Sequence, residues 1–210
     1  MSDRPNLNYF TNSAFLSFDS AKGVLTNRSG TRMLGVSEDF LRGFVVACEY
    51  EAGEATRTIL RSCGKFYGRR LAMRCELELG QYAGTPLRDR PMAHFEALVA
   101  DLWSGLGMGQ LSLDFSQGRY GLIPVTLLHS PMQDIGPKGH VADDLLCGIL
   151  EGFFASFGGD ELACTQTGDA RLGSKEGTTF ILAFPETTKR VVELLATKIS
   201  HSQIVAKLTG

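Results

Sequence analysis

The chain has 210 residues, 43% of them hydrophobic, and a formal net charge of −2 from 21 basic and 23 acidic residues. This size and composition suit one domain with a sizeable core. Without a basic excess to neutralise phosphates, we expect no nucleic-acid partner. The N-terminus is polar and no run of about 18 apolar residues occurs, so we expect no signal peptide and no membrane span. Five cysteines, odd in number and far apart, indicate reduced thiols and a cytoplasmic chain.

The first 36 residues alternate apolar and polar side chains in short runs. Ala14–Asp19 and Gly23–Thr26 predict a small hairpin, and Thr31–Val36 predicts a third short strand. We assign residues 1–36 to an N-terminal hairpin segment that belongs to the same domain as residues 37–210.

A long helical pattern follows, from Ser37 to about Leu79. Ser37 suits an N-cap, because its hydroxyl can accept hydrogen bonds from free amides of the first turn. Gly53 marks a bend or a break. Gly64 and Gly68 lie four residues apart, and each glycine costs roughly 1 kcal/mol relative to alanine in a helix. We therefore expect another element, or a ligand, to approach the helix backbone at these glycines.

A second long helix is predicted from Thr85-Pro86 to Leu106, because proline fits a first helical turn. A cluster of glycines ends it. Gln110–Phe115 and Tyr120–Leu127 then predict a hairpin around a Ser-Gln-Gly-Arg turn.

The last third of the chain contains a helix, two strands and a final helix. Apolar residues at steps of four form one broad helical face, made of Val141, Leu145, Ile149, Phe153 and Phe157. Two strand-like runs lead to Phe184, and Pro185 starts the final helix. This order favours an α+β fold, an antiparallel sheet of hairpins packed on long helices, over a doubly wound parallel sheet.

Two segments resemble the 4-vinyl-reductase-type domain family. The first is Cys48-Glu-Tyr-Glu-Ala-Gly-Glu-Ala-Thr-Arg-Thr-Ile-Leu-Arg-Ser-Cys-Gly-Lys-Phe-Tyr-Gly68, similar to a family helix with Gly-x-x-Ala, an apolar pair and Gly-x-x-x-Gly. The second is Cys147-Gly-Ile-Leu-Glu-Gly-Phe-Phe-Ala-Ser-Phe-Gly158, similar to a family helix that precedes a strand pair. With the pattern between them, the resemblance covers roughly Ser37 to Phe184.

The resemblance implies a ligand-binding fold like that of transport-particle subunits and phenol-sensor domains. Residues 37–210 would then be a 4-vinyl-reductase-type ligand-binding domain. The family's occurrence in phototrophs, cyanobacteria among them, further implies a tetrapyrrole ligand and a role in pigment supply or photosystem II assembly.

The chain departs from the family at a zinc site. Sensor members of the family hold zinc through cysteines in a pattern that ends in Cys-x-Phe. When Phe180 is aligned with that phenylalanine, Thr178 and Ala170 stand near the two cysteine positions, and Cys164 lies too early. Cys147 matches a cysteine of some members, but one thiol does not hold zinc. We therefore expect no zinc.

Several side chains are candidates for lining an apolar ligand cavity. Trp103, Phe153 and Phe157 have the aromatic character that such cavities use, and each also fits a plain core position. Gly64 and Gly68 are candidates because they would let a ligand reach the helix backbone.

Three histidines are further candidates for the ligand site. His94 lies on the second long helix, where it could act as a base or a ligand, or be a surface residue. His129 and His140 bracket a loop rich in proline and glycine. The loop could be a lid, and a neutral imidazole there could bind the metal of a tetrapyrrole, or both histidines could be solvated.

The absence of catalytic sequence motifs favours a binding protein over an enzyme. We find no Gly-x-Ser-x-Gly turn, no Cys-x-x-Cys pair and no dinucleotide fingerprint. The leading hypothesis is a non-enzymatic protein that holds an apolar or tetrapyrrole-like molecule between the long N-terminal helices and the C-terminal unit. The alternatives are a vinyl reductase acting on a chlorophyll precursor, and an interaction module that forms a homodimer or binds a photosystem-assembly partner.

Overall fold

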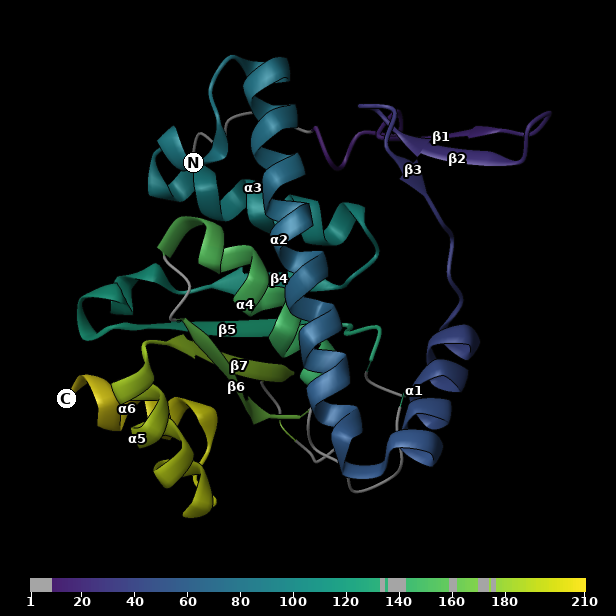
Figure 1. Ribbon diagram of the computed structural model, residues 1–210. Coiled ribbons are helices and arrows are strands. Elements are labelled where there is room, and N and C mark those ends of the chain that lie inside the picture. The colour runs from purple at the N-terminus through teal and green to yellow at the C-terminus, as the bar shows by residue number, and fades with distance from the viewer. Residues whose placement is uncertain (1–8, 133–134, 136–142, 159–161, 170–173, 175–176) are drawn as a thin grey trace.

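The computed structural model describes residues 9–132, 135, 143–158, 162–169, 174 and 177–210 (Figure 1). Along the chain, its elements are β1 (Leu16–Asp19), β2 (Val24–Asn27), β3 (Arg32–Met33), α1 (Glu38–Ala52), η1 (Gly53–Ala55), α2 (Thr56–Ala83), η2 (Leu87–Asp89), α3 (Met92–Gly105), β4 (Gln110–Leu113), η3 (Phe115–Tyr120), β5 (Leu122–Leu128), α4 (Asp144–Gly158), β6 (Ala163–Gly168), β7 (Thr178–Ala183), α5 (Pro185–Ala196) and α6 (His201–Thr209).

An antiparallel sheet with the strand order β4-β5-β7-β6 lies between two layers of helices (Figure 1). Strand β7 is buried along its whole length, because alternate side chains enter two different cores. Phe180 and Leu182 join the main core with residues of α2, α3 and α4. Ile181 and Ala183 join a smaller core with residues of α5 and α6, such as Val191. The predicted α+β architecture is thus confirmed.

Helices α2 and α4 pack with their backbones in contact, and glycines on both helices make this possible. A Cβ atom on Gly64 would lie 2.8 Å from the amide nitrogen of Ile149, and one on Gly68 would lie 2.8 Å from that of Phe153. Gly148 on α4 has the reciprocal position, since a Cβ there would meet the backbone of Arg61 and Lys65. The close approach expected at Gly64 and Gly68 is therefore an approach of another element, α4.

A second antiparallel sheet, β1-β2-β3, is tied to α2 through a buried carboxylate. Glu78 of α2 accepts hydrogen bonds from the Tyr9 hydroxyl at 3.1 Å, from Asn27 Nδ2 at 2.9 Å and from the Ser29 hydroxyl at 2.5 Å. Burial and the nearby Glu78 charge raise the pKa of Tyr9 to about 12. The N-terminal hairpin expected from the sequence is confirmed, although its third strand is only two residues long.

Helix α3 begins later than the sequence suggested. It starts at Met92 and not at Pro86, which precedes the short helix η2. Arg90 has ψ 150°, an extended conformation, because the ring of Pro91 disfavours the helical region for the residue before it. The chain therefore turns at Pro91 and starts the helix after it.

The C-terminal helix is two helices. Helix α5 ends at Ala196, and Lys198 has a left-handed backbone with φ 57°. Helix α6 then starts with a capping box, in which Ser200 and Gln203 bond each other's backbone amides. Among the described residues, no helix is both long and apolar enough to cross a membrane.

Candidate ligand site between helices α3 and α4

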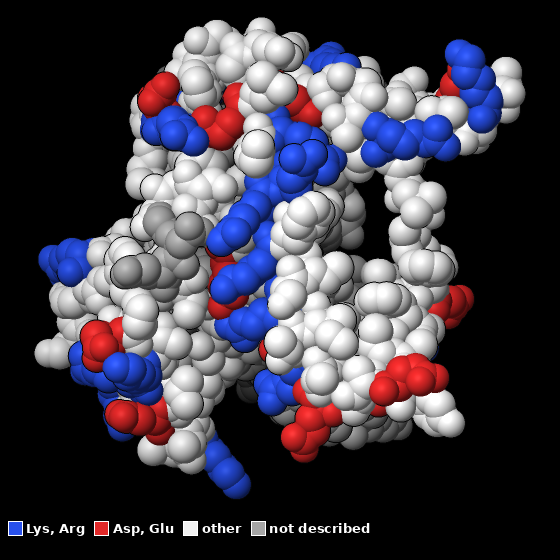
Figure 2. Space-filling view, in the orientation of Figure 1, with Lys and Arg blue, Asp and Glu red and all other residues white. Residues whose placement is uncertain are grey.

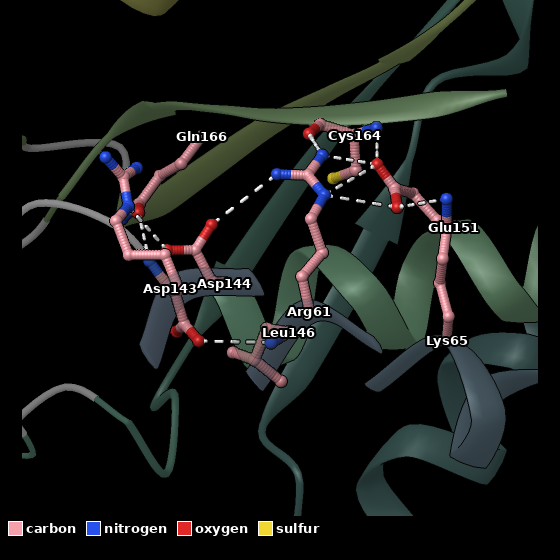
Figure 3. A network of polar contacts seen from close by, with 9 residues as sticks. Arg61, Lys65, Asp143, Asp144, Leu146, Glu151, Cys164 and Gln166 are labelled. Atoms are coloured by element: carbon pink, nitrogen blue, oxygen red, sulfur yellow. Dashed lines mark hydrogen bonds and ion pairs between the residues drawn. The ribbon is translucent and has the colours of Figure 1, made fainter. Parts of the chain in front are cut away.

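Helix α4 is held at its centre by a buried carboxylate, Glu151, whose residue is only 1% exposed (Figure 3). It accepts hydrogen bonds from Arg61 of α2 and from the amide of Cys164 of β6, the latter at 2.8 Å. Lys65 Nζ lies 3.1 Å from its second oxygen. Burial alone would raise the pKa of Glu151, but the hydrogen bonds from Arg61 and Cys164 outweigh it and lower the pKa.

The first turn of α4 is fixed by two more carboxylates. Asp143 accepts a hydrogen bond from the Leu146 amide at 3.2 Å, as an N-cap does, and its own amide donates to Gln166 of β6 at 2.7 Å. Asp144 accepts from Arg57 Nε at 2.9 Å. Helix α4 is thus clamped to α2 and to the sheet at both its start and its middle, which makes it a rigid wall.

Two buried thiols meet where α4 packs on β6. Cys147 and Cys164 are both buried, and Cys147 is close enough to influence the Cys164 thiol. Burial, followed by this contact, raises the pKa of Cys164 well above its ordinary value. A thiol with a raised pKa is a poor nucleophile at neutral pH. Within the described residues, no group of three or more His, Cys, Asp or Glu side chains could hold a metal ion.

A cavity of about 410 Å³ opens where α3, β5 and the C-terminal end of α4 meet. We call it the α3–α4 pocket. Apolar side chains make most of its wall, and a few polar residues complete it: Met92, Phe95, Phe115, Ile123, Phe154, Phe157 and Leu162, with Arg88, Arg90, Ser156 and Gly158. It lies between the second long helix and the C-terminal unit, which is within the region where the sequence placed a ligand.

The aromatic wall of the α3–α4 pocket is ordered by edge-to-face contacts. The ring centroid of Phe95 lies 5.7 Å from that of Phe115 and 5.1 Å from that of Phe157, with the rings nearly perpendicular in both pairs. Phe154 contacts Phe153 at 5.3 Å. Such pairs contribute about 0.5–1.5 kcal/mol beyond area burial and fix ring positions. The wall is therefore pre-formed.

Two arginines supply the charge of the pocket wall. Arg88 Nε donates to Glu76 at 3.1 Å, and the Arg88 amide donates to the same carboxylate at 2.8 Å. Arg90 Nη2 donates to the Thr85 carbonyl at 2.9 Å, while its Nε is buried and has no hydrogen-bond partner. Both residues precede α3: Arg88 lies in the short helix η2, and Pro91 holds Arg90 extended.

A second cavity, of about 300 Å³, lies between the N-terminal sheet, α2 and α3. Its wall includes Met33, Arg74 and the buried carboxylate of Glu78. We call it the hairpin pocket. Polar and charged residues make up more of its wall than they do in the α3–α4 pocket, so it suits an apolar ligand less well.

The aromatic candidates from the sequence lie in one connected cluster. Phe157 lines the α3–α4 pocket. Phe153 is fully buried behind it, with ring centroids 5.4 Å apart. Trp103 packs edge-to-face on Phe153 at 5.8 Å, and its indole Nε1 is buried without a hydrogen-bond partner. Pocket lining by Phe153 and Trp103 stays a prediction, as does a ligand contact at Gly64 and Gly68.

The histidine candidates are not brought together by the described structure. His94 is half-buried on α3, and His129 is exposed with a left-handed φ of 56°. Neither belongs to the wall of the α3–α4 pocket or of the hairpin pocket. His140 lies outside the described residues, so the proposed lid is not tested.

The residues that sequence reasoning missed are the two arginines and the ring partners of Phe157. Arg88 and Arg90 were not singled out, because they fell within the long helix predicted from Thr85-Pro86 to Leu106. Their signal was Pro91, which delays the start of the helix, so that Arg88 lies in the short helix η2 and Arg90 is extended. Phe95 and Phe115 were placed in the helix and hairpin expected there, but nothing in the pattern joins them across the fold.

Comparisons with known proteins bear on the fold. The sequence matches no protein-family model, and no curated protein matches it. Among solved structures, the phenol-responsive sensory domain of the transcription activator PoxR, crystallised with phenol, aligns with a TM-score of 0.68 and 14% identity, over 93% of this chain and 98% of that chain.

Two further structures align less well. A vinyl-4-reductase family protein from Methanocaldococcus jannaschii gives a TM-score of 0.48 and 12% identity, over 72% of this chain and 83% of its own. Subunit 3 of a trafficking protein particle complex from Naegleria fowleri, covalently bound to palmitic acid, gives a TM-score of 0.49 and 16% identity, over 69% of this chain and 90% of its own. Scores this low carry no argument.

The chain therefore has the same fold as the PoxR domain, mixed α and β with antiparallel sheets and long helices. The structural similarity to the PoxR domain extends over nearly the full length of both chains. At 14% identity this likeness shows the fold alone. Membership of the 4-vinyl-reductase-type family stays a prediction.

Proposed function

We propose that the chain is a non-enzymatic binding domain for a small apolar molecule, which occupies the α3–α4 pocket. The observation that carries the proposal is a pre-formed, aromatic-lined cavity of about 410 Å³ against the clamped helix α4. Its volume and composition fit ligand sites, which are typically about 300–1,000 Å³ and mostly apolar with a few polar groups. The fold supports it, since the PoxR domain is phenol-responsive and was crystallised with phenol.

The wall chemistry supports binding over catalysis. Among its described residues, the polar side chains are Arg88, Arg90 and Ser156. None is a carboxylate, a histidine or a cysteine, which are the usual general acids, bases and nucleophiles. A site of this kind can orient and desolvate a ligand, but it offers no group for proton transfer near neutral pH.

A pocket-filling substitution tests the proposal. We would titrate phenol, 4-phenylbutanol and 4-phenylbutyrate into the protein by calorimetry, and repeat the titrations on Ile123→Trp, which fills the pocket from β5. Val192→Trp adds the same ring at an exposed position on α5 and serves as the control. We expect one site per chain, lost in Ile123→Trp and kept in Val192→Trp. Binding that survives Ile123→Trp, or no binding of any of the three compounds, would overturn the proposal.

The tetrapyrrole ligand, with a role in pigment supply or photosystem assembly, is a narrower version of this proposal. It rests on the family resemblance alone, and no histidine of the described pocket wall offers an axial ligand. An absorption spectrum of protein purified from a pigment-containing host would test it. A bound chromophore would support it, and the absence of both a chromophore and titratable haem binding would remove it.

The vinyl reductase alternative has its own test. Incubation of a divinyl chlorophyll precursor with the protein and a nicotinamide or flavin reductant should give monovinyl product if the activity exists. No product would exclude the activity and leave binding as the function.

A second candidate function, homodimer formation, is favoured by an exposed stripe on α2 that is apolar except for Arg70. Exposed residues alternate at spacings of four and three along this helix: Ile59, Cys63, Phe66, Arg70, Met73 and Leu77. Phe66 is 72% exposed and Leu77 61%. This is the spacing of a helix that packs its seam against a partner helix. We call these six residues the α2 seam.

Helix α1 offers a matching surface on the same chain. Phe40 and Tyr50 are 62% and 87% exposed, and Val45 is the one buried residue of the helix. Together the exposed apolar residues of α1 and the α2 seam present an area on the order of 1,000 Å², since a large aromatic side chain alone presents about 150–250 Å². A stable interface needs about 800 Å² from each partner.

Charge supports a second copy of this chain as the occupant. Lysines and arginines follow α2 as a continuous stripe (Figure 2), including the exposed residues Arg57, Arg69 and Arg70. Helix α1 begins with Glu38 and Asp39 and has no basic residue in its last turn. Because one chain carries both surfaces, α1 of one copy can face α2 of the other in a twofold dimer.

The mass of the protein in solution tests the dimer. We expect sedimentation equilibrium to give a dimer at low salt that weakens as salt screens the charges. Phe66→Asp, in the α2 seam, should give a monomer. Phe18→Asp, on the equally exposed β1, should leave the dimer unchanged. A wild-type monomer at all concentrations, or equal effects of the two variants, would contradict this second function.

A further inference from the structure

We infer that the ligand of the α3–α4 pocket is an amphipathic carboxylate, with its apolar body among the phenylalanines and its carboxylate against Arg90 and Arg88. The inference rests on the proposed function and narrows its ligand class. The observation behind it is the pairing of an aromatic wall with two arginines in one cavity. A neutral hydrocarbon or phenol would offer these two guanidinium groups no group of opposite charge.

The guanidinium group of Arg90 has one hydrogen bond to the chain and one buried donor without a partner. Its Nη2 donates to the Thr85 carbonyl at 2.9 Å, which fixes the plane of the guanidinium. Its Nε is buried without a partner, and an unmade hydrogen bond of a buried charged group is costly. A guanidinium has five N–H donors arranged to bond both oxygens of a carboxylate. Arg90 also lines the pocket, so the guanidinium donors that the Thr85 bond leaves open can face a ligand acceptor.

Arg88 is the second arginine of the pocket wall, and it is paired with Glu76. Its Nε and its amide both bond Glu76, which anchors the residue to α2. Glu76 does not line the pocket, and neither does the exposed Asp89 between the arginines. The charged groups in the described wall are thus both positive, and the complementary ligand charge is negative.

The apolar side chains of the pocket indicate which group is attached to the ligand carboxylate. Phe95, Phe115 and Phe157 present ring edges and faces, and Ile123 and Leu162 present aliphatic surface. This wall suits an aryl or a medium-length alkyl group joined to the carboxylate. We therefore place the ligand among arylalkanoic and medium-chain carboxylic acids.

A matched pair of probes tests the inference. We would measure the dissociation constants of 4-phenylbutyrate and of its neutral amide, 4-phenylbutyramide, at pH 7 and low salt. The acid should bind at least about 10-fold more tightly, because a charge-assisted hydrogen bond is stronger than a neutral one. Arg90→Gln should remove this preference while amide binding changes less than about twofold. Arg119→Gln, an exposed arginine outside the pocket wall, is the control and should change neither constant.

The wild-type protein gives a second readout that does not depend on a variant folding. Added salt should weaken binding of the acid and leave that of the amide unchanged, because only the acid is held by charge. If acid and amide bind equally and respond equally to salt, the inference is overturned while ligand binding by the pocket stands. If neither probe, nor phenol, nor 4-phenylbutanol binds, the proposed function and the inference both fall.

Discussion

Helices α4 and α1 have the same length, fifteen residues, and opposite surroundings. Ten residues of α4 are buried, including Asp144 and Glu151, whose charges are paired with basic residues of α2. In α1 only Val45 is buried. The difference shows that α4 packs within the chain, whereas most of α1 is exposed. The proposed dimer would cover the apolar surface of α1. Substitutions in α4 should therefore lower the stability of the isolated chain, and those in α1 should affect association.

A large difference, with opposite signs, is expected from adding one methyl group to a glycine of each helix. Gly148→Ala places a Cβ against the backbone of Arg61 and Lys65, which cannot move aside as a side chain can. We expect a loss of about 3 kcal/mol in the free energy of unfolding, the upper part of the range for overpacked cores. Urea denaturation followed by circular dichroism measures it.

The matched change in α1 should have the opposite sign. A Cβ on Gly43 has no atom within 4 Å. Gly43→Ala should therefore stabilise the chain by about 0.5–1 kcal/mol, because alanine is the better helix former. Equal effects of the two substitutions would mean that α2 and α4 are not in backbone contact.

A smaller loss is expected from removing the central charge of α4. Glu151→Gln leaves Lys65 without this carboxylate and leaves Arg61 with Asp144 at 3.5 Å, and breaking a buried pair costs about 3–5 kcal/mol. The two cations are partly exposed, at 35% and 44%, so water screens them and we expect about 2 kcal/mol. In α1, Glu38 is 52% exposed in its pair with Arg42, and Glu38→Gln should cost less than about 0.5 kcal/mol. Chemical denaturation of both variants at pH 7 compares them.

The pH dependence of stability should reveal the contribution of the same carboxylate, Glu151. The pKa of Glu151 is lowered in the folded chain, so folding favours its ionised form. Its contribution is complete above the ordinary value of 4.5 and is lost as the pH falls through the lower folded value. The stability gap between wild type and Glu151→Gln should therefore narrow between pH 7 and acid pH. A gap that stays constant or widens would contradict the lowered pKa.

The smallest effect on folding is expected from α1. Phe40 is 62% exposed, so Phe40→Ala should change the stability of the dilute monomer by less than about 0.5 kcal/mol. Phe153→Ala, in α4, should cost about 3–5 kcal/mol because that ring is fully buried. Denaturation at low protein concentration separates folding from association. A large loss in Phe40→Ala would show that α1 packs within its own chain.

Local signals in the sequence predicted most elements and some of their ends. Ser37 was expected to cap α1, and its hydroxyl does accept from the Phe40 amide at 3.3 Å. The alternation before Asp19 and after Gly23 gave the β1–β2 hairpin. Pro91 and the Ser200 capping box were equally local signals, and reading them would have placed the start of α3 and of α6.

The α3–α4 pocket could be predicted only in part, because it depends on contacts between distant segments. Helical spacing marked Phe157 as a candidate, but its partner Phe95 is 62 positions earlier in the chain. Helix α4 also packs closely on α2, through Gly148 and Gly64, in addition to its contact with the sheet. No periodicity within one segment carries that pairing, and tertiary packing decides which apolar faces meet.

The measurement that tests the account most directly uses the methionines as reporters of the two cavities. The chain has six methionines, of which Met92 lines the α3–α4 pocket and Met33 lines the hairpin pocket. With ¹³C-methyl methionine, titration of 4-phenylbutyrate should shift the Met92 signal in a saturable way and leave Met33 unchanged. A saturable shift of Met33 with an unmoved Met92 would place the ligand in the hairpin pocket and contradict the central claim.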